Sequence, residues 1–200
     1  MKKIFLIISL IVPLFAAAAT TASSVVEKTV ETIRKAPSIS ANITIETEGH
    51  PATGTIILSG DRFMIDSQVG SRWFDGKTLW AYSPQTNEVT VTEPTDEELA
   101  EINPFQFLKS ARNDFTPRLL KSAAGAYTVE LKPKKGNSGI TSAVVTVDSS
   151  TYLIKSIKLT VNKQVINIRL SSVRTGKALP DSIFRFEKRM LPKAEINDLR

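Results

Sequence analysis

The side chain with the most obvious catalytic potential in this sequence is its one histidine. His50 lies in the segment Glu48-Gly49-His50-Pro51, which is typical of a hairpin loop. A catalytic triad requires a histidine within hydrogen-bond reach of both a nucleophile and an orienting carboxylate. A turn histidine that precedes a proline is poorly placed for this work. We therefore interpret His50 as a solvated loop residue.

A cluster of carboxylates is the second candidate, because paired acids are the machinery of glycosidases. The cluster follows Thr95 and consists of Asp96, Glu97, Glu98 and Glu101. Threonine is a preferred helix N-cap, and acids in a first helical turn are stabilised by the helix dipole. The sequence also lacks cysteine, a second imidazole and a glycine-rich phosphate loop. We predict a protein that is not an enzyme, with no metal site and no cofactor.

The first residues predict export. Lys2 and Lys3 precede an apolar run of 12 residues, 4–15, and small alanines follow at 16–19. A helix that spans a bilayer needs about 20 apolar residues, so this run is too short. The pattern is typical of a cleaved secretory signal over residues 1–19, with an uncleaved anchor as the alternative. It predicts a periplasmic protein.

The rest of the chain, residues 20–200, is predicted to form a single domain. It contains no cysteine, so it has no disulfide and no acceptor for a lipid anchor. Loss of the two signal lysines lowers the formal charge from +6 to +4. This excess suits contact with anionic surfaces or acidic partners, or solubility alone. Nucleic acid is not expected, because no aromatic residues interleave the basic cluster of Lys132, Lys134 and Lys135.

The hydrophobic pattern predicts one helix and then a series of strands. Ser24 and Glu27 suggest a capping box at the start of the helix, and Val26, Val30 and Ile33 follow at helical spacing. Residues 38–47 alternate between apolar and polar side chains, with a period of two. Similar strands are predicted at 52–59, 62–67, 70–75, 77–83, 88–92, 127–131, 143–148, 153–161, 166–170 and 183–186. Short helices interrupt them between 95 and 111. The short turns predict an antiparallel sheet of roughly ten or eleven strands.

Large apolar side chains are predicted to share one face of this sheet. They are Ile43, Ile45, Ile57, Phe63, Ile65, Trp73, Leu159, Ile166 and Ile168. A closed barrel would pack such residues into a solid core, whereas a half-open barrel with helical lids would leave an apolar cavity. The alternation is compatible with both arrangements.

Three segments carry a resemblance to a known family. Residues 73–84, which read WFDGKTLWAYSP, closely resemble the D-G-K-T-L-W-x-Y-x-P signature of the periplasmic lipoprotein carrier family, LolA. Residues 103–108 (NPFQFL) look like the proline-phenylalanine-led helix of that family. Residues 192–200 are similar to its P-x-x-x-E-[VI]-x-D-L-R ending. Together with the export signal, the resemblance extends over the whole mature chain.

The resemblance implies an unclosed β-barrel with an α-helical lid that carries acylated lipoproteins. The carrier would be a monomer that receives its cargo from an inner-membrane lipoprotein-releasing ABC transporter and delivers it to an outer-membrane receptor. A chain of about 16 carbons costs roughly 12 kcal/mol in water, so transport needs a cavity that hides it. The expected cavity residues are Ile43, Ile45, Ile57, Phe63, Ile65, Trp73, Phe105 and Leu108.

One turn departs from the family pattern. Members carry an arginine followed by a proline after the second strand, and this arginine latches the lid. The corresponding turn here reads Ser59-Gly60-Asp61, and Arg62 is the nearest basic residue. Arg62 is therefore the candidate latch for a lid formed by the first helix and residues 99–108, in a divergent member of the family. Alternatives are a sensor of lipid or lipoprotein with the same fold, and a packed structural or interaction domain without a ligand.

Overall fold

The computed structural model describes residues 20–134 and 139–200, so the expected signal at 1–19 and Lys135 of the basic cluster lie outside the described residues. The first element is helix α1 (Ala22–Lys35). Its N-cap is Thr21, whose hydroxyl accepts a hydrogen bond from the Ser24 backbone N–H at 3.1 Å. The Ser24 hydroxyl accepts in turn from the Thr21 N–H, so the capping box begins one turn earlier than predicted. The predicted pairing of Ser24 with Glu27 is wrong.

The dominant feature is one sheet of twelve strands. In chain order these are β1 (Ser38–Thr47), β2 (His50–Ser59), β3 (Arg62–Ser67), β4 (Gly70–Phe74), β5 (Leu79–Ser83), β6 (Glu88–Thr92), β7 (Phe115–Leu120), β8 (Ala126–Pro133), β9 (Ile140–Asp148), β10 (Ile154–Val161), β11 (Gln164–Gly176) and β12 (Glu195–Asp198). The sequence pattern missed β7, which contains Pro117, and β12.

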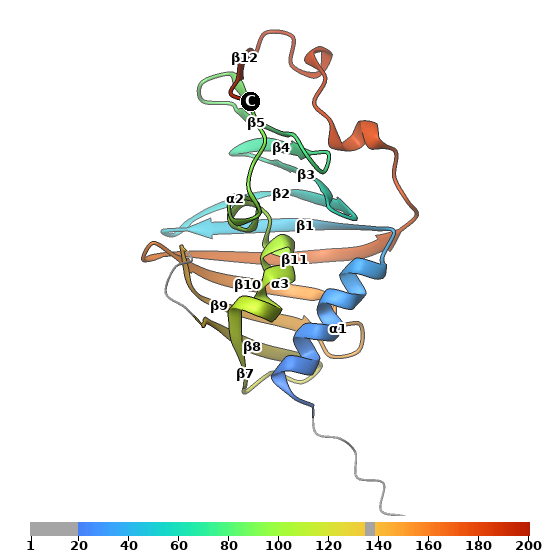
Figure 1. The fold of residues 1–200 in the computed structure, drawn as a ribbon, viewed down its shortest axis with the longest axis vertical. Helices are drawn as coiled ribbons and strands as arrows, with labels where there is room; N and C mark the ends of the chain where they lie inside the picture. The colour runs from blue at the N-terminus through green and yellow to red at the C-terminus, as the bar shows by residue number, and fades with distance from the viewer. Residues whose placement is uncertain (1–19, 135–138) are drawn as a thin grey trace, which may run out of the picture.

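The sheet is open, with β12 at one end and β7 at the other (Figure 1). Its order is β12-β6-β5-β4-β3-β2-β1-β11-β10-β9-β8-β7. Consecutive strands pair as hairpins from β1 to β6 and again from β7 to β11, and β11 returns to pair with β1 in the middle of the sheet. The predicted class, a mostly-β unclosed antiparallel barrel with short helices, is confirmed. One pairing differs, because β12 runs parallel to β6.

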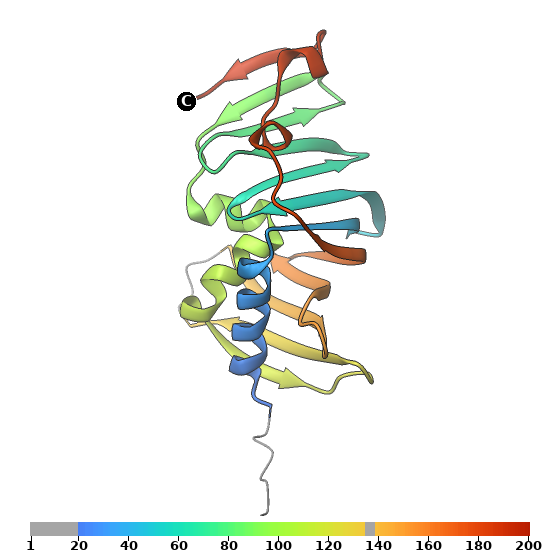
Figure 2. The same cartoon turned by 90° about the vertical axis from the view of Figure 1, so that its right-hand side faces the viewer.

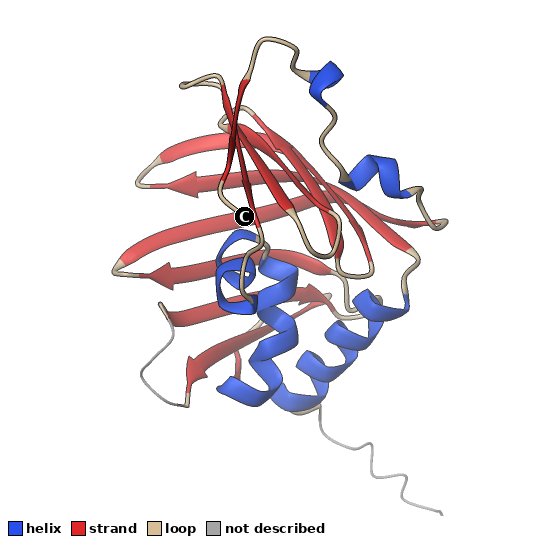
Figure 3. Ribbon diagram, turned by 45° about the horizontal axis from the view of Figure 1, so that its top comes forward, coloured by secondary structure: helices blue, strands red, loops and turns tan. Residues whose placement is uncertain are grey.

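Three helices cover one face of the sheet. Helices α2 (Asp96–Ile102) and α3 (Pro104–Asp114) connect β6 to β7, and they lie with α1 on the same side (Figures 2 and 3). We call this side the inner face. Its buried cluster joins Val25 and Val26 of α1 to Leu99 of α2, to α3 and to strands throughout the sheet.

The C-terminal segment covers part of the opposite side, the outer face. It runs from β11 along one side of the sheet (Figure 1) and contains two 3-10 helices, η1 (Asp181–Phe184) and η2 (Lys188–Met190). A strand predicted at 183–186 is therefore wrong. A second apolar cluster on the outer face comprises Val89, Val91 and Ala194, with Trp80, Tyr82, Phe186 and Leu191 packed against it.

Candidate functional site

The inner face collects six of the eight residues that the sequence placed in a lipid cavity. Ile43, Ile45, Phe63 and Ile65 project from the sheet, and Phe105 and Leu108 project from α3, and all six belong to one cluster or pack against it. Strand pairing explains the grouping, because Phe63 lies opposite Leu58 and Ile65 lies opposite Ile56 in the register of β2 and β3. Directly paired residues point to the same side of a sheet.

Ile57 and Trp73 do not lie on the inner face. Cross-strand pairing places Ile57, Met64, Trp73 and Trp80 in one row. Met64 directly follows Phe63 in β3, so this row points to the face opposite that of Phe63. The Trp73 ring packs 5.6 Å from the ring of Phe186 on the outer face. The prediction that Ile57 and Trp73 share a face with Phe63 is therefore wrong. A shift of one residue in the reading of a strand exchanges its faces.

The inner-face residues that the sequence analysis missed are the immediate chain neighbours of Ile57 and Trp73. Phe74 replaces Trp73, since it lies opposite Phe63 and stacks on its ring with the centroids 5.3 Å apart. Ile56 and Leu58 replace Ile57 in β2. The signal for β2 was weak, because the apolar run of Ile56, Ile57 and Leu58 has no alternation from which a face can be chosen.

Side chains of the helices pack against the inner face in this conformation. Between α1, α3 and the sheet lies a void of about 10 Å³, lined by Ile33, Ala36, Ile39, Leu58, Gly60, Asn103 and Phe105. This volume is comparable with a single water. The space that an open half-barrel would offer to an acyl chain is thus occupied by helical side chains such as Phe107, which packs edge-on against Phe115 at 5.0 Å.

Helix α1 is held to the sheet by apolar contacts, but it also buries one polar group that has no hydrogen-bond partner among the described residues. Val25 and Val26 are buried against the sheet and α3. Thr29, on the same side of the helix, is 1% exposed, and its hydroxyl has no hydrogen-bond partner among the described residues. A buried polar group without a partner costs about 1–3 kcal/mol. The docked position of α1 is therefore less stable than its apolar contacts alone would make it.

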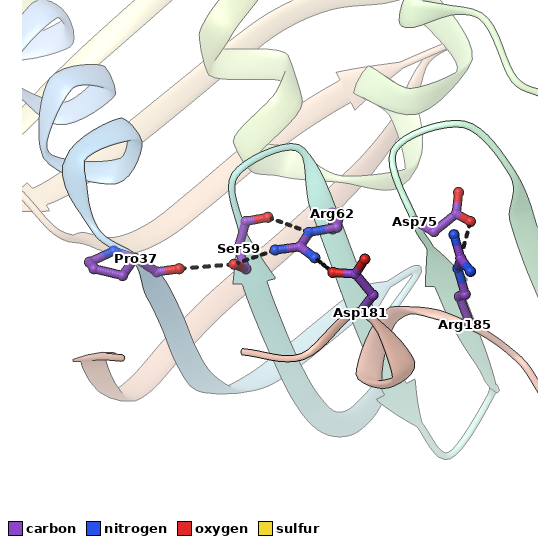
Figure 4. A network of polar contacts seen from close by, with 6 residues as sticks. All are labelled: Pro37, Ser59, Arg62, Asp75, Asp181 and Arg185. Carbon is purple, nitrogen blue, oxygen red and sulfur yellow. Dashed lines mark hydrogen bonds and ion pairs between the residues drawn. The ribbon is translucent and has the colours of Figure 1, made fainter. Parts of the chain in front are cut away.

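Arg62 lies on the outer side, and Ser59 links it to Pro37, which follows α1, because the Ser59 hydroxyl donates to the Pro37 carbonyl at 2.9 Å (Figure 4). Its guanidinium donates to the backbone carbonyl and the hydroxyl of Ser59 at 3.3 and 3.1 Å, and forms an ion pair with Asp181 of η1. It also stacks 4.9 Å from the ring centre of Phe184. In this conformation the guanidinium of Arg62, the candidate latch, thus pairs with Ser59 and Asp181 and not with α1, α2 or α3 among the described residues. The side chain alternates with inward-facing Phe63, so it points to the C-terminal segment instead.

Asp75, the first residue of the D-G-K-T signature, makes a second contact with the same segment (Figure 4). One carboxylate oxygen accepts from the backbone N–H groups of Lys77 and Thr78 at 3.1 and 2.9 Å, which shapes the turn before β5. The other oxygen accepts from the guanidinium of Arg185 at 3.0 Å. The signature aspartate thus has a structural role in this chain, in the turn and in the attachment of residues 181–186.

The outer face also carries a pocket of about 450 Å³. It lies between β3, β4 and β5 and the segment that follows η2. Its lining mixes apolar, polar and charged groups, namely Met64, Asp66, Ser67, Gln68, Gly70, Ser71, Trp73, Tyr82, Pro84, Met190 and Leu191. Trp73 therefore belongs to this pocket and not to the inner face.

The residues considered first for chemistry stand apart from these features. His50 is exposed at the start of β2. Glu98 belongs to the capping box of α2, where its carboxylate accepts from the Thr95 backbone N–H at 2.8 Å. In the part of the chain that the structure describes, no group of three or more histidine and acidic side chains is arranged to hold a metal ion. No described helix is both long and apolar enough to cross a bilayer.

Comparison with known proteins agrees with this architecture. A structure of an uncharacterised conserved protein from Thermus thermophilus matches with a TM-score of 0.59 and 9% identity, over 88% of this chain and 98% of that one. A DUF1329 family protein from Desulfovibrio piger matches with a TM-score of 0.50 and 13% identity, over 86% of this chain and all of that one. At this identity the likeness shows a shared fold.

A LolA superfamily protein from Nitrosomonas europaea also matches, at a TM-score of 0.44 and 15% identity, over 84% of this chain and 99% of that one. Curated proteins give no match. The family model described as outer membrane lipoprotein carrier protein LolA matches residues 12–163, which include α1, the sheet from β1 to β10 and both lid helices. The chain belongs to the LolA outer-membrane lipoprotein carrier family.

Proposed function

We propose that this protein is a periplasmic carrier that shields the acyl chains of lipoproteins on its inner face. The observation that carries the proposal is the construction of that face. A sheet lined with large apolar side chains is covered there by three separate helices and not by a second sheet. Such a cover can move without breaking the hydrogen bonds between strands. Membership of the lipoprotein carrier family supports the same role.

Loading requires the helices to give way, since side chains of α1 and α3 are buried against the apolar strands. Displacing α1 would expose Val25 and Val26 together with part of the sheet. An entering acyl chain covers that surface again, and burial of about 16 carbons contributes roughly 12 kcal/mol. During loading an acyl chain takes the place of α1 on the apolar sheet, and during release α1 takes the place of the acyl chain. The sheet stays covered in both states, which suits a carrier that must also release its cargo.

The proposed route follows from the family. An inner-membrane lipoprotein-releasing ABC transporter would load the carrier, and an outer-membrane receptor would accept the cargo. The role is one of binding and transfer, with no chemical change to the cargo.

A packed structural domain is the second candidate, and the filled inner face favours it. The two functions predict different behaviour toward a long acyl chain. A carrier takes up an acylated lipoprotein saturably and in a ratio near one to one, whereas a packed domain binds none before it unfolds.

The test compares two neighbouring residues of β1 that are both half-buried but lie on opposite faces. Ile45 packs against the inner cluster, whereas Thr44, its predecessor in the strand, points to the outer face. Ile45→Glu should abolish binding of a purified triacylated lipoprotein, because a carboxylate on the cavity wall is costly beside acyl chains. Thr44→Glu should bind like the parent protein. Failure of the parent to bind, or equal loss in both variants while both stay folded, would contradict the proposal.

A further inference from the structure

Arg72 is a cation on the inner face. In the register of the sheet it lies directly between Ile65 of β3 and Ala81 of β5. Ile65 belongs to the buried inner cluster, and paired residues share a side, so the Arg72 side chain projects from the same side as the apolar floor. Its chain neighbours Ser71 and Trp73 point outward. Arg72 therefore marks the place where the apolar floor meets the more polar end of the sheet at β5 and β6.

The Arg72 side chain is half-buried and has nothing to balance its charge. No hydrogen bond or ion pair to its guanidinium occurs among the described residues, although ten other lysines and arginines there form ion pairs within 4.0 Å of a carboxylate. Burial lowers the pKa of Arg72, and no neighbouring carboxylate opposes that effect. An arginine nevertheless stays protonated in proteins, so the site is a partly desolvated positive charge.

Two carboxylates of the neighbouring strands, Glu88 and Asp66, do not pair with Arg72. Glu88, on the inner side of β6, is two strands away and two residues along from the position opposite Arg72, so the two Cα atoms are about 12 Å apart in regular sheet geometry. Asp66 follows Ile65 directly, but it points to the outer face, where it accepts from the Ser71 hydroxyl at 2.5 Å. Among the described residues, therefore, the cation faces the inner side without a counter-ion.

We propose that Arg72 binds the anionic head group, a phosphate or a carboxylate, of an acyl lipid whose chain lies on the apolar floor beside Ile65. This inference rests on the proposed function, because it uses the same inner face, and it extends the cargo to amphiphiles that carry a negative charge next to their acyl chains. A guanidinium presents paired N–H donors that match the oxygens of both anions. A partly desolvated charge also gains more from a counter-ion than one in water does.

The experiment uses three ligands with one acyl chain in common and different head groups. Palmitate carries a carboxylate, 1-palmitoyl lysophosphatidate carries a phosphate, and monopalmitoylglycerol is neutral. Each displaces a fluorescent acyl probe from the purified protein and from three variants, Arg72→Gln, Arg72→Lys and Arg169→Gln. Arg169 is the matched control, because it pairs with Glu46 at 2.8 Å on the outer face.

We expect the parent protein to bind at least one of the two anions about tenfold or more tightly than the glyceride, which is the effect of one charge-assisted contact. Arg72→Gln should remove this preference without changing affinity for the glyceride. Arg72→Lys should retain part of the preference, and Arg169→Gln all of it. The comparison of palmitate with lysophosphatidate identifies the preferred anion.

The result that overturns the inference is equal affinity for all three ligands in the parent, or a preference that survives in Arg72→Gln. An equal loss of all three ligands in Arg72→Gln would also overturn it, because that result assigns Arg72 a structural role. If the parent binds none of the three and no triacylated lipoprotein, the proposed function itself fails. If it binds all three without distinction and also binds the triacylated lipoprotein, the proposed function stands and only the role of Arg72 falls.

Discussion

At the scale of single residues, Asp148 shows how a polar side chain holds a turn of this sheet. Its carboxylate accepts from the hydroxyl and the backbone N–H of Ser150 and from the backbone N–H of Thr151, at 2.6–3.0 Å. Lys155 forms an ion pair with it at 3.0 Å. These bonds, the Ser150 hydroxyl first, hold the pKa of Asp148 well below its usual range. The turn between β9 and β10 is therefore organised by a carboxylate that must be ionised.

A pH dependence of stability follows. A carboxyl group with a lowered pKa in the folded state stabilises the protein above its ordinary pKa, near 4, and loses this effect as the pH falls further. Asp148→Asn should therefore lower the free energy of unfolding at pH 7, and the gap between variant and parent should narrow at pH 3. Urea denaturation at the two pH values measures both gaps. A gap of the same size at pH 7 and pH 3 would contradict this assignment.

At the scale of elements, apolar packing holds the lid helix α1 on the sheet, and the buried hydroxyl of Thr29 makes that docked position less stable. Helices α1 and α3 contact each other, and α1 also contacts β7 and β8. The Lys28 ammonium reaches the Tyr152 hydroxyl at 3.3 Å and lies over its ring, which ties α1 to the turn after β9. Against these contacts stands the buried hydroxyl of Thr29, for which the described residues offer no partner.

Thr29→Val tests whether this hydroxyl sets the stability of the lid. Valine has nearly the same shape and removes the polar atom, so the free energy of unfolding should rise by about 1 kcal/mol. The more stable lid should also weaken binding of an acyl probe by up to about fivefold, because opening becomes more costly. Urea denaturation and probe titration give the two values. Val30→Thr, a reciprocal change on a half-buried neighbour, is the control and should not strengthen the lid.

Unchanged stability in Thr29→Val would show that the hydroxyl is satisfied in solution. Greater stability with unchanged acyl binding would show that α1 does not move during loading.

At the scale of the whole molecule, an open sheet has two edges, and the chain treats them differently. The β7 edge contains Pro117, which lacks an N–H and so discourages a further strand from pairing. The other end is closed by β12, which is short and exposed, and which covers the edge of β6 in parallel register. Ala194, just before β12, packs with Val89 and Val91.

Removal of residues 195–200 should therefore expose β6 as a longer edge with apolar neighbours. We expect the truncated protein to unfold at lower temperature and to self-associate, because unpaired backbone groups on an edge recruit other strands. Light scattering and thermal denaturation measure the two effects. Ile196→Ser, which removes a 44% exposed side chain and keeps the strand, separates edge pairing from surface apolarity. A monomeric truncation with parent stability would show that β12 does not protect the sheet.

Much of the architecture could be predicted from the sequence. The alternation of residues 38–47, the turn sequences and the D-G-K-T-L-W signature determined a mostly-β chain of the LolA family with helices between two groups of strands. These are local signals, since side-chain alternation and turn chemistry depend on residues close together in the chain. The approximate strand boundaries and the membership of Phe63 and Ile65 in one apolar row followed from the same patterns.

Only the tertiary structure decided which row of each strand lies beneath the lid. Trp73 and Phe74 are both aromatic, so their order alone could not show that Phe74 faces inward while Trp73 meets Phe186 on the outer face. Both faces of the strands from β3 to β6 bear apolar residues because the C-terminal segment covers the outer one. The same long-range contact determined the partner of Arg62 and the parallel pairing of β12. Contacts between residues more than a hundred positions apart leave no periodic trace in the sequence, so the structure alone could reveal them.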